Sequence, residues 1–205
     1  MKTSPFKIEI EKVEELEKNL EFLSDLDLET AFLSLCGGAM IQIQISEYAM
    51  LGLIAHLKEE LLGSNRDFKD LNPQRFISND LDDKEYRKQT LGTIIRFLKN
   101  NVKLFSVDDL NSYLDKRNDF IHNFWRLYLS NNRDKIRSEK LKAFKFVISV
   151  YKDSLKWTSI FKGFIYACAV NIAAMNGKSI DSFKNLQEHY QMFLDSTIIN
   201  DQSKQ

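Results

Sequence analysis

Apolar residues recur along most of the chain at intervals of three or four positions, the spacing that gathers side chains on one face of an α-helix. The run Ile41–Ile45 alternates as a strand would, but it continues a helical stripe and has no second strand to pair with. We therefore expect an all-α fold, a helical bundle with additional C-terminal helices. The predicted helices span about 6–23, 28–62, 82–100, 107–129, 133–175 and 179–195.

The helix ends are predicted from capping and helix-breaking residues. Asp25 or Asp27 is expected to cap the second helix, and the adjacent glycines Gly37 and Gly38 are expected to weaken it locally. A break near Gly163 is expected in the fifth helix, and Asn176-Gly177 is expected to end it. We expect one helical domain over 1–205, with a core at about 28–129, a helical extension at about 133–195, a polar loop at 63–82 that is mobile or used for contacts, and a frayed tail at 197–205.

The composition favours a helical protein and gives little global bias toward a partner. Among 205 residues, 7 Gly and 2 Pro are too few for a turn-rich β-architecture. The formal net charge is zero, but nine acids and four lysines lie in residues 1–30, and nine bases and three acids lie in residues 133–162. The basic stretch predicts either a phosphate-facing surface or a solvated helix face, and the second is the commoner case.

The cysteines and the N-terminal residues bear on the protein's location. Cys36 and Cys168 have no metal-type spacing, and Met1–Lys12 is charged without the apolar run of a signal peptide. We therefore expect a cytoplasmic protein. The apolar span 157–175 contains Lys162 and Asn171, which favours a buried helix over a membrane span.

The strongest candidate for chemistry lies in the helix at 107–129. Arg117 falls within its apolar stripe, where an unpaired guanidinium would be costly, while Asn118 and His122 lie four positions apart on the flank. Histidine transfers protons near neutral pH, and arginine binds phosphate through two hydrogen bonds and stabilises its developing charge. The set Arg117, Asn118 and His122 therefore suits phosphodiester chemistry, with Asn118 orienting the imidazole or the ribose.

The stretch Arg117–His122 resembles the R-x4-6-H motif of the HEPN superfamily, including the polar residue after the arginine. Thr90-Leu91-Gly92 in the preceding helix is also similar, and the resemblance covers about 28–129. One departure is Phe124, because some HEPN toxins carry a tyrosine at that position, which a partner nucleotidyltransferase modifies. This departure from the family's pattern argues against regulation by that route and against a toxin of that particular type.

The resemblance implies a metal-independent endoribonuclease that leaves a 2′,3′-cyclic phosphate, with a role in toxin–antitoxin systems or phage defence. It implies RNA as the substrate, a homodimer through the motif helices, and an antitoxin protein as a further partner. Arg117 would bind the phosphate, His122 would be the general base or acid, and Asn118 would orient. No cofactor or metal and no membrane partner are expected.

Several alternatives stay open at this point. The chain could be a non-catalytic HEPN-like module that binds RNA, a nucleotide or a protein, or a purely structural helical dimer. Arg117 could simply pair with Glu47, which lies in a largely apolar setting and could instead be a second catalytic carboxylate. The aromatic group Phe120, Phe124, Trp125 and Tyr128 is more typical of a core or a dimer interface than of a base-stacking surface.

Overall fold

A computed structural model describes residues 5–61, 108–130 and 136–202. These residues form helices without a strand among them, which confirms the expected all-α fold. The predicted loop at 63–82 and the predicted helix at 82–100 lie outside the described residues.

The described elements follow the predicted order, with differences at their ends. The N-terminal half holds α1 (Pro5–Asn19), the 3-10 turn η1 (Leu20–Phe22) and α2 (Asp25–Leu61). The middle holds α5 (Asp108–Asn118), continued by two π-helical segments, η6 (Asp119–Asn123) and η7 (Trp125–Leu129). The C-terminal part holds α6 (Arg137–Asn176), the 3-10 segment η9 (Asp181–His189) and α7 (Tyr190–Gln202).

The chain divides into two compact units that alternate along the sequence. Unit 1 consists of Met1–Ile45 and Asp109–Trp157, and unit 2 consists of Ser46–Asp108 and Thr158–Gln205. Helices α2 and α6 each contribute to both units. The expected single domain with a core at 28–129 stays a prediction.

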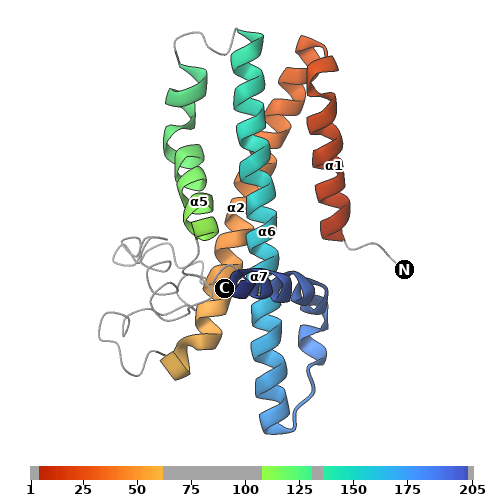
Figure 1. Cartoon of the computed structure of the whole chain (residues 1–205), viewed down its shortest axis with the longest axis vertical. Coiled ribbons are helices and arrows are strands. Elements are labelled where there is room, and N and C mark those ends of the chain that lie inside the picture. The colour runs from red at the N-terminus through yellow and green to blue at the C-terminus, as the bar shows by residue number, and fades with distance from the viewer. Residues whose placement is uncertain (1–4, 62–107, 131–135, 203–205) are drawn as a thin grey trace, which may run out of the picture. The chain divides into compact units, whose positions relative to one another are not determined.

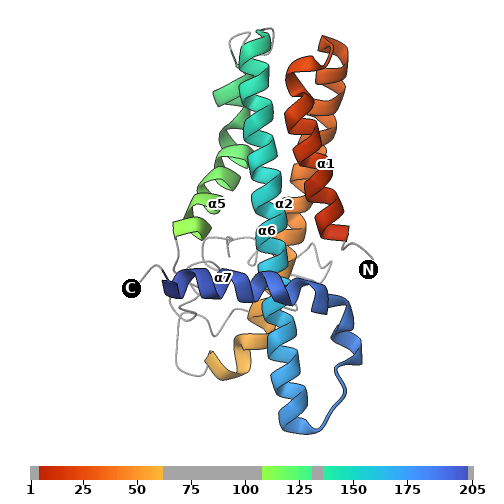
Figure 2. The same cartoon turned by 45° about the vertical axis from the view of Figure 1, so that its right-hand side comes forward.

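In unit 1, α1, the first part of α2, α5 with its continuation and the first part of α6 run beside one another (Figures 1 and 2). Each helix places apolar residues three or four positions apart on its inner face, so the faces pack into one core. The thirteen buried residues of this core come from all four helices: Val13, Leu20, Leu28, Phe32, Leu35, Ala39, Ile43, Phe120, Ala143, Phe144, Val147, Ile148 and Val150.

The cap of α2 is Ser24, not the expected Asp25 or Asp27. The Ser24 Oγ accepts a hydrogen bond from the Asp27 backbone N–H at 3.2 Å and donates its own proton to the Asp27 carboxylate at 2.6 Å. The Asp27 carboxylate also lies in the first turn, where the partial positive charge of the helix dipole stabilises it. This reciprocal pair satisfies a backbone donor that the helix itself leaves unpaired.

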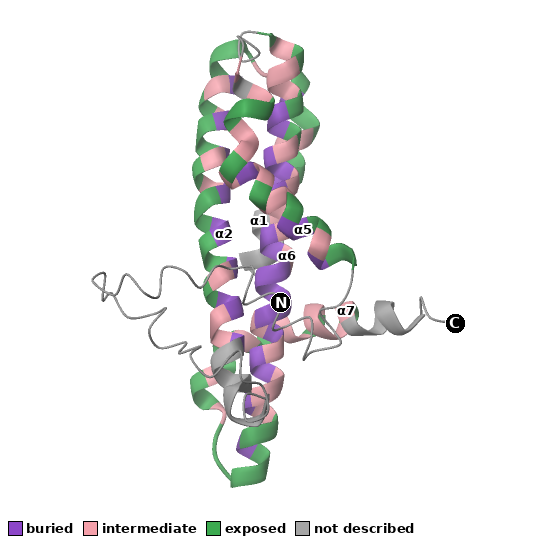
Figure 3. Cartoon of the chain, turned by 90° about the vertical axis from the view of Figure 1, so that its left-hand side faces the viewer, coloured by how far each residue is buried: buried purple, intermediate pink, exposed green. Residues whose placement is uncertain are grey.

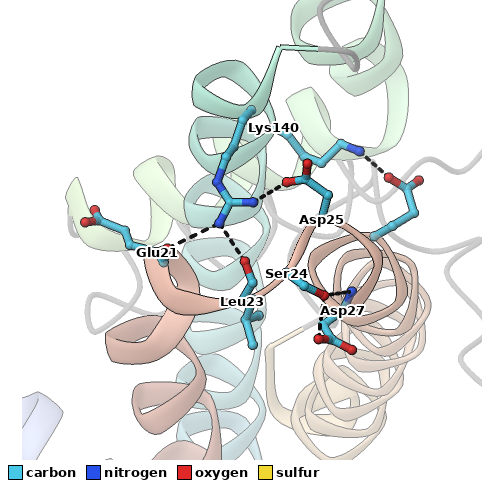
Figure 4. A network of polar contacts seen from close by, with 8 residues as sticks. Glu21, Leu23, Ser24, Asp25, Asp27 and Lys140 are labelled. Atoms are coloured by element: carbon cyan, nitrogen blue, oxygen red, sulfur yellow. Dashed lines mark hydrogen bonds and ion pairs between the residues drawn. The ribbon is translucent and has the colours of Figure 1, made fainter.

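The basic stretch of α6 pairs with the acidic N-terminal region instead of forming a free cationic surface. Arg137 pairs with Asp25 and also donates to the backbone carbonyl of Leu23 at 2.7 Å (Figure 4). Three lysines follow along α6 with partners on α1, η1 and α2: Lys140 with Glu29, Lys145 with Glu21 and Lys152 with Glu17. These contacts favour the second reading of the charge pattern, a solvated helix face. Exposed ion pairs of this kind add at most ~1 kcal/mol each to the stability of the fold. Their main effect is on how α6 is aligned along its neighbouring helices.

In unit 2, η9 and α7 return along the second part of α6, and α7 crosses it (Figures 1 and 2). Phe164 stacks on Phe193 with ring centroids 5.0 Å apart, and Tyr166 contacts Tyr190 at 5.5 Å. The predicted stop at Asn176-Gly177 is confirmed. Gly177 has φ +61°, the left-handed conformation that glycine adopts without strain, and the Lys178 N–H bonds to the Ala173 carbonyl.

Two predictions about the helices are wrong. Helix α6 continues as α-helix through Gly163. Helix α2 is also continuous through Gly37 and Gly38, and the local weakening expected there stays a prediction. The last helix does not end near Asp195, because α7 runs to Gln202. Gly163 has a packing role, since a β-carbon there would lie 2.4 Å from the carbonyl oxygen of His189.

Two helices are long and apolar enough to cross a membrane by length and composition alone. They are Asp25–Leu53, with 33% of its most apolar window buried inside the protein, and Arg137–Asn176, with 50% buried. The core helices of a soluble protein satisfy the same criterion. The expectation of no membrane partner therefore stays a prediction.

Replacing Gly163 with alanine is expected to destabilise unit 2 by about 1–3 kcal/mol, the usual cost of overpacking. The new methyl group would overlap the His189 carbonyl and the Phe193 β-carbon, so η9 and α7 would have to move. Chemical denaturation measures the change. Gly38→Ala is the matched control, because a β-carbon there meets only the Tyr151 ring at an ordinary 3.5 Å, and helix propensity then favours alanine. Equal stability of the two variants would contradict this account of Gly163.

Candidate functional site

The segment that carries Arg117, Asn118 and His122 is held in unit 1 by its opposite side. Leu110, Tyr113 and Leu114 of α5 are buried, and Phe120 of η6 is 7% exposed. Two ion pairs join α5 to α6: Lys116 contacts Asp153 at 2.7 Å, and Lys156 contacts Asp109 at 3.0 Å. The candidate residues therefore lie on a segment whose other face is fixed.

An aromatic cluster forms most of that fixed face. Phe124 lies at its centre, with ring centroids 5.2 Å from Phe120 and 5.3 Å from Tyr128. It also reaches Phe32 on α2 and Phe146 on α6, each at 6.0 Å. Aromatic pairs at these distances add to the stabilisation that burial provides. Most of the predicted aromatic group is thus packed within unit 1.

Trp125 departs from that group. Its side chain is 71% exposed, whereas Phe120, Phe124 and Tyr128 are buried or half-buried. The neighbouring Arg126 is exposed as well. The sequence predicted the core or a dimer interface for Trp125. Its exposure excludes the core, and the interface stays a prediction.

Among the predicted site residues, the structure brings Arg117 and Asn118 together. The Arg117 Nη1 donates a hydrogen bond to the Asn118 Oδ1 at 3.0 Å, and Arg117 is half-buried while Asn118 is exposed. The expected role of Asn118 was to orient the imidazole or the ribose. Here its amide oxygen orients the guanidinium, and its amide nitrogen is left to donate elsewhere.

His122 is exposed and lies five positions after Arg117 in the same helical run. The predicted polar flank is confirmed in that Asp115, Asn118, His122 and Arg126 are all exposed. However, the expected α-helical spacing ends at Asn118, because η6 and η7 are π-helical. A π-turn bonds residue i to residue i+5, so side chains beyond Asn118 are offset from an ideal α-helical stripe, and such turns are common at functional sites.

Within η6 the wide turn is braced by a side-chain bond. The Asn123 amide donates to the Asp119 carboxylate at 3.0 Å. Burial, with a contribution from the Asp119 charge, raises the pKa of Tyr128, which keeps that phenol protonated and neutral at physiological pH. Asp119 is therefore a structural anion of the segment, distinct from the exposed edge that Asn118 and His122 form.

Glu47, the acid considered as a partner of Arg117 or as a catalytic carboxylate, belongs to unit 2 and is half-buried. Arg117 belongs to unit 1. The pairing of Glu47 with Arg117 therefore stays a prediction.

Other reactive groups offer weaker sites. Burial raises the pKa of the Cys36 thiol to about 11, so its thiolate is scarce at neutral pH and it is a poor nucleophile. The His189 Nδ1 lies 3.1 Å from the Ser159 Oγ in unit 2, but Ser159 is 1% exposed and a substrate would not reach it. Among the described residues there is no group of three His, Cys, Asp or Glu side chains that could hold a metal ion.

The arrangement along α5 and η6 can therefore bind an anion at the Arg117 guanidinium and exchange a proton at the His122 imidazole. Both side chains reach solvent from a segment that is fixed on its other face. The guanidinium is partly oriented before any ligand arrives, which lowers the entropic cost of binding. The chain matches no model of a known protein family, and comparison with curated proteins and with solved structures gives no match.

The half-buried His189 is expected to make unit 2 sensitive to acid. Burial, and then the charge of Lys162, lower the pKa of His189 below its ordinary value near 6.5, and these effects outweigh the opposing charge of Glu188. The unfolded chain then binds a proton that the folded chain resists, so the free energy of unfolding falls as the pH drops below about 6.5. At higher pH the imidazole is neutral in both states and contributes no pH dependence.

Denaturation curves collected between pH 5 and pH 8 measure how the free energy of unfolding changes with pH. His189→Gln retains a hydrogen-bonding group near Ser159 but does not titrate, so its curve is expected to be flatter over this range. His122→Gln is the matched control, because it removes a histidine that is exposed. An unchanged acid sensitivity in His189→Gln would contradict this assignment.

Proposed function

We propose that the protein is a metal-independent endoribonuclease of the HEPN type, acting in a toxin–antitoxin or phage-defence setting. The observation that carries the proposal is the hydrogen bond from Arg117 to Asn118, on an exposed edge that also bears His122. The resemblance of Arg117–His122 to the HEPN motif supports the same reading.

The proposed reaction is an intramolecular transfer within RNA. His122 accepts the proton of a ribose 2′-hydroxyl, whose oxygen then attacks the adjacent phosphorus. A bond forms between the 2′-oxygen and phosphorus, the bond from phosphorus to the 5′-oxygen breaks, and the departing oxygen takes up a proton. The products are a 2′,3′-cyclic phosphate and a 5′-hydroxyl end.

Arg117 serves the transition state in this proposal. Its guanidinium binds a non-bridging phosphate oxygen, where negative charge increases as the 2′-oxygen attacks. Asn118 holds the guanidinium through its amide oxygen and offers its amide N–H groups to the ribose or phosphate. The proposed reaction needs no metal ion, because the guanidinium supplies the positive charge that stabilises the phosphate in the transition state.

A dimer through the motif helices belongs to the same proposal. It would bring two Arg117–His122 sets to one RNA backbone, so that one imidazole accepts the proton while the other donates to the leaving oxygen. An antitoxin protein and an RNA substrate are the partners that the proposal implies.

RNA cleavage in the presence of EDTA is the direct test. His122→Ala is expected to lower the rate about 10²–10⁴-fold through loss of acid–base catalysis, and Arg117→Ala about 10²–10³-fold through loss of charge stabilisation. Cleavage of a labelled RNA, followed on a denaturing gel, measures both. Ser112→Ala is the matched control, because Ser112 is exposed on the same α5 segment and has no assigned role.

The variants are informative only if they fold, and both replaced side chains reach solvent, so their thermal unfolding is expected to match that of the wild type. Cleavage that disappears with EDTA and returns with added magnesium would contradict the proposal. So would full activity in folded His122→Ala.

Trp125 favours a second candidate function, a module that binds RNA without cleaving it. Its exposed indole beside the exposed Arg126 is suited to stacking on an unpaired base. The same residue would hold substrate in the nuclease, so its behaviour alone does not separate the two functions, whereas turnover does.

Trp125→Ala is expected to weaken binding of single-stranded RNA by about 1–3 kcal/mol, the usual value of one stacked base. In the Trp157→Phe background, Trp125 is the single tryptophan, because the chain contains two. Quenching of its fluorescence on addition of an oligonucleotide then reports stacking directly. Unchanged fluorescence at saturating RNA would show that the indole is not a base platform.

A further inference from the structure

One face of α2 in unit 1 is apolar and open to solvent. Its exposed positions follow the helical repeat and lie opposite the face that packs into the core (Figure 3). They are Leu26, Thr30, Leu33, Gly37, Ile41 and Gln44. We call these six residues the outer face of α2.

The chemistry of the outer face is unusual for a surface that meets water. Leu26, Leu33 and Ile41 are 77%, 62% and 60% exposed. No charged residue occurs between Glu29 and Glu47, although the solvent side of a helix usually carries charges. With the flanking Met40 and Ile45, the open surface amounts to roughly 500 Å², near the upper end for the largest apolar patch on a monomer.

Gly37 is a second, independent observation. It lies in the interior of a helix, where glycine costs about 1 kcal/mol relative to alanine. A β-carbon at Gly37 would meet nothing within 4 Å, so packing within the described chain does not require glycine there. A bare backbone at the middle of an apolar face instead permits another helix to approach closely.

Four positions of the outer face are arranged symmetrically about Gly37. Leu33 lies four positions before it and Ile41 four positions after it. Thr30 and Gln44 lie seven positions before and after it. Two identical helices that cross antiparallel at Gly37 would therefore place Leu33 opposite Ile41 and Thr30 opposite Gln44.

We propose that the outer face of α2 binds the same face of a second copy of this chain, with the two helices antiparallel and Gly37 at the two-fold axis. A two-fold contact requires a surface that is complementary to itself, and the symmetric pattern supplies this property. The two copies together would bury roughly 1,000 Å², the lower range for a specific interface. This contact goes beyond the proposed nuclease and does not depend on Arg117 or His122.

A lipid bilayer fits the outer face less well. Charged side chains lie near the N-terminal end of α2. Asp25, Glu21 and Lys145 are 86%, 70% and 53% exposed. A bilayer deep enough to cover Leu26 would also bury the charge of the adjacent Asp25, at a cost of several kcal/mol. A protein surface covers the apolar stripe and leaves the charges in water.

Disulfide cross-linking tests the contact and its direction in the full-length protein. In a background with Cys36→Ala and Cys168→Ala, we would prepare Leu33→Cys and Ile41→Cys and oxidise them separately and mixed. The antiparallel register predicts a linked dimer several times more abundant in the mixture than in either variant alone. Self-linking of Leu33→Cys at full yield would indicate a parallel arrangement and overturn the proposal, as would no linked dimer in any sample.

Sedimentation measurements on uncleaved protein give a second readout. Gly37→Gln is expected to raise the dissociation constant of this contact at least tenfold, because its side chain occupies the crossing point, while its β-carbon meets no atom of the described chain within 4 Å. Ile172→Gln is the control, since Ile172 is an exposed apolar residue of α6 outside this face, 45% exposed. Circular dichroism checks that both variants fold.

The other occupants give distinct results that overturn the proposal. A monomer that sediments with vesicles of phosphatidylcholine and phosphatidylglycerol, and loses this binding in Gly37→Gln, would assign the face to lipid. A cysteine at Ile41 that links within one chain to a cysteine at Ile94 would assign it to residues 62–107 of the same chain. A dimer unaffected by Gly37→Gln and linked only through cysteines on α5 would restrict association to the motif helices.

Discussion

The packing of Phe124 against rings from two other helices is the contact on which the candidate site depends. It ties η6 and η7 to α2 through Phe32 and to α6 through Phe146. Because this side of the segment is fixed, the residues on its other side have a defined direction toward solvent. The site is therefore built on a rigid element, which is what positioning of a guanidinium and an imidazole requires.

The same packing accounts for the π-helical turns. A π-turn has poorer packing along its axis than an α-turn, so it persists where side-chain contacts compensate. Here the aromatic cluster and the Asn123–Asp119 hydrogen bond both make side-chain contacts within the turn. Trp125 and His122 are both exposed on this segment, so the proposed acid–base group and the proposed stacking surface lie within one short stretch.

Charge and apolar surface are divided between different faces of unit 1. The acids of the N-terminal region and the bases of α6 neutralise each other, as Arg137 with Asp25 illustrates (Figure 4). The outer face of α2, in contrast, has no charge. The acids and bases are unevenly distributed along the sequence, but their pairing leaves little unpaired positive charge on the described part of α6. The uncharged face of α2 is the surface through which we propose association.

Helical periodicity was sufficient to predict the fold class and the order of the described helices, because a buried face needs apolar residues every three or four positions. It did not predict the π-helical turns, since the same residues suit an α-helix and only tertiary packing selects the wider turn. The break at Gly163 was wrong for a related reason: the glycine serves a close contact with the His189 carbonyl and not a change of direction. At the site, exposure of Asn118 and His122 follows from the pattern, whereas the Arg117–Asn118 bond depends on side-chain rotamers and the exposure of Trp125 depends on the π-turns.

We propose that the Arg117–His122 edge cleaves RNA by directing a ribose 2′-hydroxyl at the adjacent phosphate. The most direct measurement uses two oligonucleotides of one sequence, one all-ribose and one with 2′-deoxyribose throughout, incubated with the protein without metal and analysed by mass spectrometry. We expect fragments with cyclic-phosphate ends from the all-ribose strand, whereas the deoxyribose strand should stay intact. Cleavage of both strands, or fragments that carry a 5′-phosphate, would contradict it.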